Sequence, residues 1–130
     1  MAEKFAPRLR QTIKRAAFWL LWPAAALVIW GELAPAPELP SIGLWDKLEH
    51  FTAYFGLALM SVLGWSGRRA PRIFFSVILL GGVLEILQAH VGRDAEWGDM
   101  LANTLGALTG TLLALGLLAA ARLVDRKRSD

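Results

Sequence analysis

The chain has 130 residues, of which 55% are hydrophobic, and its mean hydropathy of +0.44 is high for a soluble domain. It contains no cysteine, which excludes a disulfide framework and a thiolate metal site. The net charge of +3 is carried by basic residues that flank apolar segments, so we expect no nucleic-acid partner.

Four mostly apolar segments approach the length of about 20 residues that a helix needs to cross a membrane. They are residues 16–33, 49–65, 73–91 and 100–122. The first segment could instead be a signal peptide, but it lacks a clear small-residue cleavage site, so a retained helix is favoured. We therefore predict one all-α domain over residues 1–130, an integral membrane bundle of four transmembrane helices.

The basic residues are sorted by loop. All but two of the 14 Lys and Arg residues lie in the two tails and in the loop between the second and third segments. The exceptions are Lys47 and Arg93. Because loops rich in Lys and Arg stay on the cytoplasmic side, we expect both termini to be cytoplasmic and the chain to cross the membrane four times.

Polar residues interrupt the apolar segments near the predicted outer face. Asp46 and Lys47 come just before the second segment, and His50 and Tyr54 lie within it. Glu85 and Gln88 lie in the third segment and Arg93 in the next loop. Asp99 comes just before the fourth segment, and Asn103 lies within it. Spacings of three and four residues place those of each helix on one face, and the helical rise gives them similar depths. Ionisable groups are costly in hydrocarbon. We therefore expect an outward-facing polar pocket between helices two, three and four.

The residue types suggest roles in this pocket. His50 suits proton transfer or ligand binding because histidine titrates near neutral pH, and in an enzyme Glu85 or Asp99 would orient it. The planar guanidinium group of Arg93 suits the binding of an anionic group, and Lys47 would be a second anion contact. For each residue the structural alternative is a helix cap, an ion pair or a packing contact.

A metal site is a further alternative. Four of the polar residues offer nitrogen and oxygen donors for a divalent cation, namely Asp46, His50, Glu85 and Asp99. Their spacing matches no recognised metal motif, and the cationic side chains of Lys47 and Arg93 would repel the ion. We therefore expect no metal and no other cofactor.

Two glycines of the fourth segment give it a smooth face. Gly106 and Gly110 are four residues apart, which lets another helix approach closely. Packing within the bundle is the favoured interpretation, and self-association into a homo-oligomer is the alternative.

The spaced polar residues resemble those of a known family. The pattern is Asp46-Lys47-x-x-His50-Phe51-x-x-Tyr54-Phe55, then Glu85-x-x-Gln88, Arg93, and Asp99-x-x-x-Asn103-x-x-Gly106. It is similar to the VanZ-like family, small bacterial membrane proteins named after an accessory factor in teicoplanin resistance, and the similarity extends over about residues 45–110. The resemblance implies a helical protein of the bacterial cytoplasmic (inner) membrane.

Three functional hypotheses follow. The leading one is an accessory protein of the bacterial envelope that binds the polar head of an amphiphilic molecule, such as a lipid-linked envelope precursor. Its partners would be membrane lipids, and the resemblance adds a link to glycopeptide resistance. The second is an intramembrane enzyme that modifies a lipid head group, and the third is a structural membrane subunit.

Overall fold

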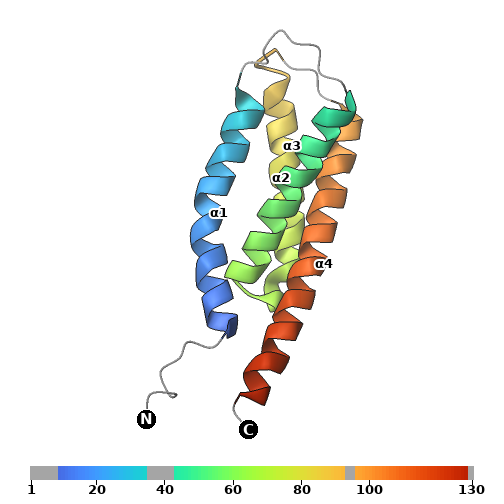
Figure 1. Cartoon of the computed structure of the whole chain (residues 1–130). Coiled ribbons are helices and arrows are strands. Elements are labelled where there is room, and N and C mark those ends of the chain that lie inside the picture. Colours follow the sequence, from blue (N-terminus) through green and yellow to red (C-terminus); the bar gives the residue numbers. More distant parts are fainter. Residues whose placement is uncertain (1–8, 35–42, 93–95, 129–130) are drawn as a thin grey trace.

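A computed structural model describes residues 9–34, 43–92 and 96–128 (Figure 1). Its elements are α1 (Leu9–Leu33), α2 (Gly43–Gly64), the short 3-10 helix η2 (Gly67–Arg69), α3 (Ala70–Gln88) and α4 (Trp97–Lys127). No strand occurs in these residues. The predicted all-α architecture is confirmed.

The helices run alternately up and down the bundle. The start of α1 and the end of α4 therefore lie at one end, here called the terminal end, and the opposite end is the loop end (Figure 1). α2 lies between α1 and α4 and packs most extensively on α4, while α3 lies behind α2. At the terminal end, η2 turns the chain from α2 into α3, which begins with Pro71 in its first turn, where proline is well tolerated.

The helices extend beyond several predicted bounds. α1 begins at Leu9 rather than 16 and α4 ends at Lys127 rather than 122, so the helical backbone continues through the basic residues that flank the two apolar segments. α2 begins at Gly43 rather than 49, whereas α3 ends at Gln88, before the predicted 91. Hydropathy predicts which residues suit the membrane interior, but it does not predict where the backbone hydrogen bonding of a helix ends.

Among the residues that the structure describes, three regions are long and apolar enough to cross a membrane, namely Leu9–Leu33, Gly67–Gln88 and Trp97–Lys127. α2 is not among them, so the predicted fourth span is not confirmed. Charged residues in the first turns of α2 lower its hydropathy, and its position between neighbours buries other polar groups, such as His50.

Close contact between α2 and α4 depends on the two glycines of α4. A Cβ atom on Gly106 would collide with the backbone carbonyl of Phe51, and one on Gly110 with that of Phe55. The small-residue face is therefore used inside the bundle, as the favoured interpretation predicted. Both glycines are buried, and α2 occupies the face on which self-association was the alternative.

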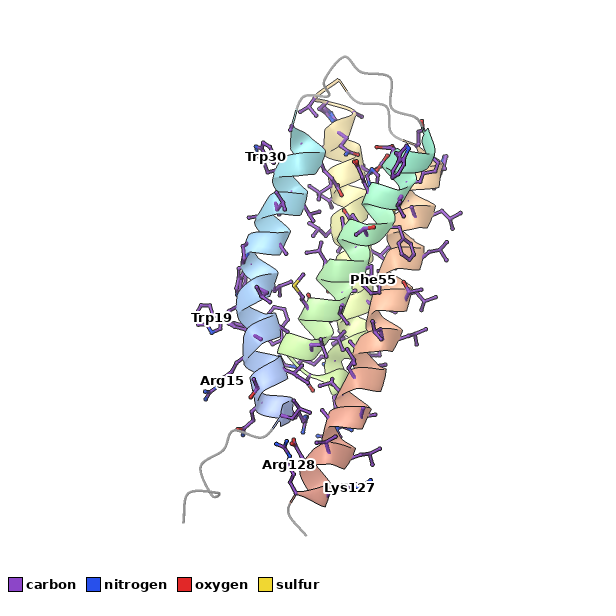
Figure 2. All side chains as sticks on the ribbon, viewed as in Figure 1. Arg15, Trp19, Trp30, Phe55, Lys127 and Arg128 are labelled. Carbon is purple, nitrogen blue, oxygen red and sulfur yellow. The ribbon has the colours of Figure 1, made fainter. Side chains whose placement is uncertain are left out.

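At the terminal end α4 caps α1. The Asp125 carboxylate accepts the backbone N–H of Leu9 at 3.0 Å and that of Arg10 at 3.3 Å. The first N–H groups of a helix have no partner within it, and a carboxylate there also suits the helix dipole. The basic side chains of Lys127 and Arg128 lie near the same end (Figure 2).

The outside of the bundle is apolar. Large side chains such as Trp19, Trp30, Phe75 and Leu79 are each more than two-thirds exposed. Figure 2 shows Trp19 and Trp30 pointing away from the bundle. An apolar exterior of this extent suits contact with lipid.

Candidate functional site

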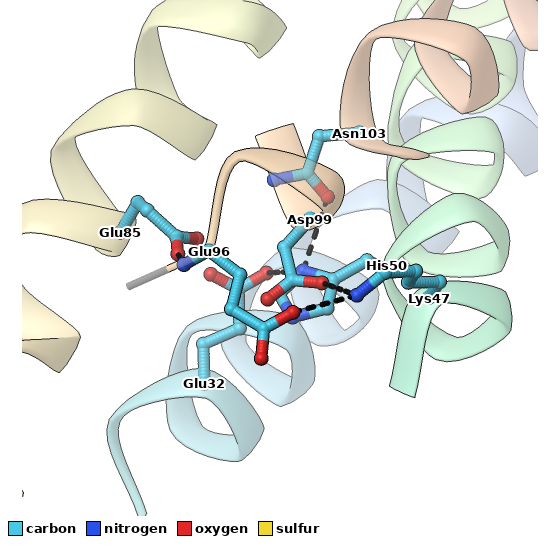
Figure 3. A network of polar contacts seen from close by, with 7 residues as sticks. All are labelled: Glu32, Lys47, His50, Glu85, Glu96, Asp99 and Asn103. Atoms are coloured by element: carbon cyan, nitrogen blue, oxygen red, sulfur yellow. Dashed lines mark hydrogen bonds and ion pairs between the residues drawn. The ribbon is translucent and has the colours of Figure 1, made fainter. Parts of the chain in front are cut away.

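Polar side chains from all four helices converge near the loop end, where they form what we call the polar cluster. Its members are Glu32 of α1, Asp46, Lys47, His50 and Tyr54 of α2, Glu85 and Gln88 of α3, Glu96 before α4, and Asp99 and Asn103 of α4. Figure 3 shows seven of these residues close together. The predicted meeting of polar groups from the second, third and fourth helices is found, and α1 adds a fourth contributor.

His50 is held by an amide from the neighbouring helix. It is 5% exposed, and its Nδ1 lies 3.1 Å from Oδ1 of Asn103. A carbonyl oxygen can only accept, so Nδ1 carries the proton in this contact and Nε2 is left to accept a proton or bind a ligand. The same Nδ1 is 3.8 Å from Oε1 of Glu32.

Glu32 is a member that sequence reasoning missed. Its Oε2 accepts a hydrogen bond from the Tyr54 hydroxyl at 3.3 Å, and its backbone carbonyl accepts one from Gln88 Nε2 at 3.1 Å. The residue is 8% exposed although it lies in the last turn of α1. The available signal was a single acidic residue at the end of an otherwise apolar segment.

Lys47 is paired with two carboxylates near the start of α4. Its Nζ lies 2.8 Å from Oε2 of Glu96 and 3.2 Å from Oδ1 of Asp99. Gly98 leaves room for this reach, because a Cβ there would collide with the Lys47 side chain. The hydrogen bond and charge of Lys47 lower the pKa of the exposed Glu96 carboxyl. The lysine that the sequence assigned to anion binding is thus engaged by two anionic side chains of the protein itself.

Glu85 joins α3 to the start of α4. Its Oε1 accepts the backbone N–H of Glu96 at 2.8 Å, close to the helix N-terminus, where negative charge is favourable. Its Oε2 is buried and has no hydrogen-bond partner among the described residues. This oxygen is therefore available to a ligand or an ion.

Space for the cluster comes partly from α3. A Cβ on Gly81 would lie 2.9 Å from Cε1 of Tyr54 and 3.1 Å from Nδ2 of Asn103. Both side chains are fully buried. The missing side chain of Gly81 therefore lets α3 lie directly against them.

A groove of about 640 Å³ opens beside the cluster, between α1 and α2. Apolar residues, including Leu27, Val28 and Ala53, line part of it, and His50 and Glu32 lie on its polar side. The sequence had placed the pocket between helices two, three and four. In the structure α4 and α3 pack closely on the other sides of α2, and the groove is on the α1 side.

The other predicted site residues lie where the sequence placed them, near the loop end. Tyr54 and Gln88 contact Glu32, and Asn103 contacts His50. Arg93 lies outside the described residues.

A family model described as VanZ/LLP1 matches residues 6–119. The chain belongs to this family. No curated protein and no solved structure matches it. The VanZ/LLP1 match confirms the resemblance seen in the spaced polar residues and extends it beyond residues 45–110, so that it also includes Glu32 and the whole of α1.

Family membership and the span-capable helices together identify a membrane protein of the VanZ type. At one end of the bundle it carries a buried imidazole, several carboxylates and an adjoining groove with apolar and polar walls.

Proposed function

We propose that this VanZ/LLP1 protein binds the polar head of a lipid-linked or amphiphilic molecule in the bacterial cytoplasmic membrane. The groove between α1 and α2 is the observation that supports this proposal. Its apolar wall, with Leu27 and Val28, suits a hydrocarbon chain, and its polar side, with Glu32 and His50, suits a head group. Because the groove is open, such a molecule could enter sideways from the lipid.

The proposed orientation places the loop end outside the cell. The terminal end carries basic side chains such as Lys127 and Arg128 (Figure 2). The described polar cluster at the loop end has five carboxylates and a single lysine, Lys47. Figure 3 shows four of these carboxylates, those of Glu32, Glu85, Glu96 and Asp99. Under the positive-inside rule this asymmetry favours cytoplasmic termini. α2 would then be the fourth crossing, with its charged first turns at the outer surface.

The head group would meet residues of the polar cluster. His50 lies at the groove, with Asn103 behind it, while Arg93 stays a prediction from the sequence as a contact for an anionic group. The accessory role in glycopeptide resistance implied by the VanZ resemblance would be one use of such binding to an envelope precursor.

A groove-filling substitution tests the proposal. Gly31 lines the groove, and a Cβ on it would meet no atom within 4 Å, so Gly31→Leu should fill space without disturbing the fold. Gly116→Leu is the matched control, since this glycine of α4 is exposed and equally unobstructed. Mass spectrometry of lipids retained after mild detergent extraction should show a molecule bound to the wild type and to Gly116→Leu but lost from Gly31→Leu. Equal retention by all three proteins would reject the groove as its site.

An intramembrane enzyme is a second candidate, which the geometry of His50 favours. Its Nδ1 is fixed by Asn103 and lies 3.8 Å from Glu32, so Nε2 would be the basic nitrogen next to the groove. Turnover of added lipid precursors by purified protein, and its loss in His50→Gln, would support catalysis. Binding of the same precursors without turnover would favour the accessory role.

A further inference from the structure

The polar cluster contains more buried carboxylates than cationic side chains. Glu32, Glu85 and Asp99 are 8%, 9% and 3% exposed. Asp99 is paired with Lys47, which lies at the edge of the cluster and is 36% exposed, whereas no Lys or Arg among the described residues forms an ion pair with Glu85. Buried carboxylates are unfavourable unless they are protonated, paired or bound to a metal. The cluster is therefore suited to bind a cation.

Three side chains provide ligand atoms at suitable separations. Asp46, His50 and Asp99 each offer one such atom, and these atoms lie within 4.8 Å of one another. Since metal–ligand distances are about 2.0–2.6 Å, an ion between the three atoms needs only small side-chain adjustments. We propose that Asp46, His50 and Asp99 form a binding site for a divalent metal cation.

Glu85 supplies an independent observation. Figure 3 shows its carboxyl group reaching from α3 toward Glu96 and Asp99. Oε1 is fixed by the Glu96 backbone, whereas the buried Oε2 has no hydrogen-bond partner in the described residues. A bound cation, directly or through a coordinated water, would satisfy this oxygen.

The orientation of His50 also suits metal binding. A histidine that ligates a metal usually donates its other ring N–H to an oxygen, which fixes the tautomer and the ring. Asn103 Oδ1 accepts from Nδ1 of His50 at 3.1 Å, which leaves Nε2 as the ligand nitrogen. Asn103 would thus be a positioning residue for the cation.

Repulsion by Lys47 is weaker than the sequence suggested. Its ammonium group lies closer to Glu96, at 2.8 Å, than to Asp99, at 3.2 Å, so a carboxylate outside the three ligands offsets its charge. The ligand set of two aspartates and one neutral histidine, with Glu85 beside it, stays anionic. Mixed nitrogen and oxygen donors of this kind suit Zn²⁺ or Mn²⁺.

Metal binding to the full-length chain in detergent tests this proposal. The protein is first treated with a chelator, and Mn²⁺ or Zn²⁺ alone is then titrated by calorimetry. We expect one bound ion per chain and an affinity at least about tenfold weaker in His50→Gln and Asp99→Asn. His90→Gln is the matched control, because His90 is the other histidine, is exposed and should leave the affinity unchanged.

Thermal unfolding with and without the ion separates ligand loss from misfolding. For each protein the melting temperature is compared with and without the ion. The ion should raise the melting temperature of the wild type and of His90→Gln, but not that of His50→Gln or Asp99→Asn. Absence of a bound ion, unchanged affinity in both ligand variants, or equal loss in His90→Gln would overturn the site. Gly31→Leu should bind the ion normally while losing the amphiphile, so failure of the proposed groove function and failure of the cation site are distinguishable.

Discussion

Gly106 of α4 lies directly against the backbone carbonyl of Phe51 in α2. His50 precedes Phe51, and Asn103 lies about one turn before Gly106, so this contact sets the separation at which the imidazole and the amide meet. The close packing of α2 on α4 and the geometry of the polar cluster therefore both depend on the absence of a side chain at Gly106.

Replacing Gly106 should separate α2 from α4. Gly106→Ala places a methyl group against a backbone atom that cannot rotate away, and we expect a loss of about 1–3 kcal/mol in the free energy of unfolding. Gly116→Ala is the control, because nothing lies within 4 Å of its added Cβ and alanine is the better helix former. Thermal unfolding in detergent measures both, and equal stability of the two variants would contradict the close contact.

Gly81→Ala should disturb the cluster from the side of α3. The new methyl group would lie 2.9 Å from a Tyr54 ring carbon and 3.1 Å from Asn103 Nδ2, so both buried side chains must shift. We expect the free energy of unfolding to fall by about 1–3 kcal/mol and ligand binding at the polar cluster to weaken. The adjacent Gly82→Ala makes only an ordinary contact, 3.6 Å from Met100, and should retain stability and binding. Similar losses of stability and binding in both variants would show that the close contact of Gly81 with Tyr54 and Asn103 does not shape the site.

The ion pair between Lys47 and Glu96 should make stability depend on pH. The folded-state pKa of Glu96 is lowered from its ordinary value of 4.5, so the pair stabilises the fold above that value and the stabilisation is lost as the pH falls through the lowered pKa. We expect the melting temperature of the wild type to exceed that of Glu96→Gln slightly at neutral pH, because exposed pairs contribute little, and the difference to vanish in acid. Glu49→Gln, at an exposed carboxylate of α2, should show no such convergence.

Membrane orientation can be measured directly because the chain has no native cysteine. A single cysteine at Glu96 should react with a membrane-impermeant thiol reagent added to intact cells, whereas one at Arg128 should react only after the membrane is permeabilised. These sites lie at opposite ends of the bundle. The reverse labelling pattern would place the groove and the polar cluster on the cytoplasmic side.

The sequence predicted the helices and most of the cluster because both rest on short-range patterns. Apolar length identifies a helix, and spacings of three or four place Lys47, His50 and Tyr54 on one face. Glu32 has no such neighbour in α1, and its partners Tyr54 and Gln88 come from other helices. Its inclusion depends on tertiary packing, which helical spacing does not encode.

The position of the groove was missed for a related reason. Polar stripes show which face of a helix is special but not which helix covers that face. The approach at Gly106 and Gly110 closes the α4 side of α2, and Gly81 does the same from α3. The groove therefore lies on the α1 side, beside Gly31 and Val28.

The cap that Asp125 places on Leu9 has a consequence for biosynthesis. These two residues are 116 positions apart, so the first turn of α1 leaves the ribosome long before its capping carboxylate does. During translation the N–H groups of Leu9 and Arg10 cannot bond to the Asp125 carboxylate until the end of α4 has been synthesised. The final closure of the bundle thus awaits the last helix, which brings the cap with it.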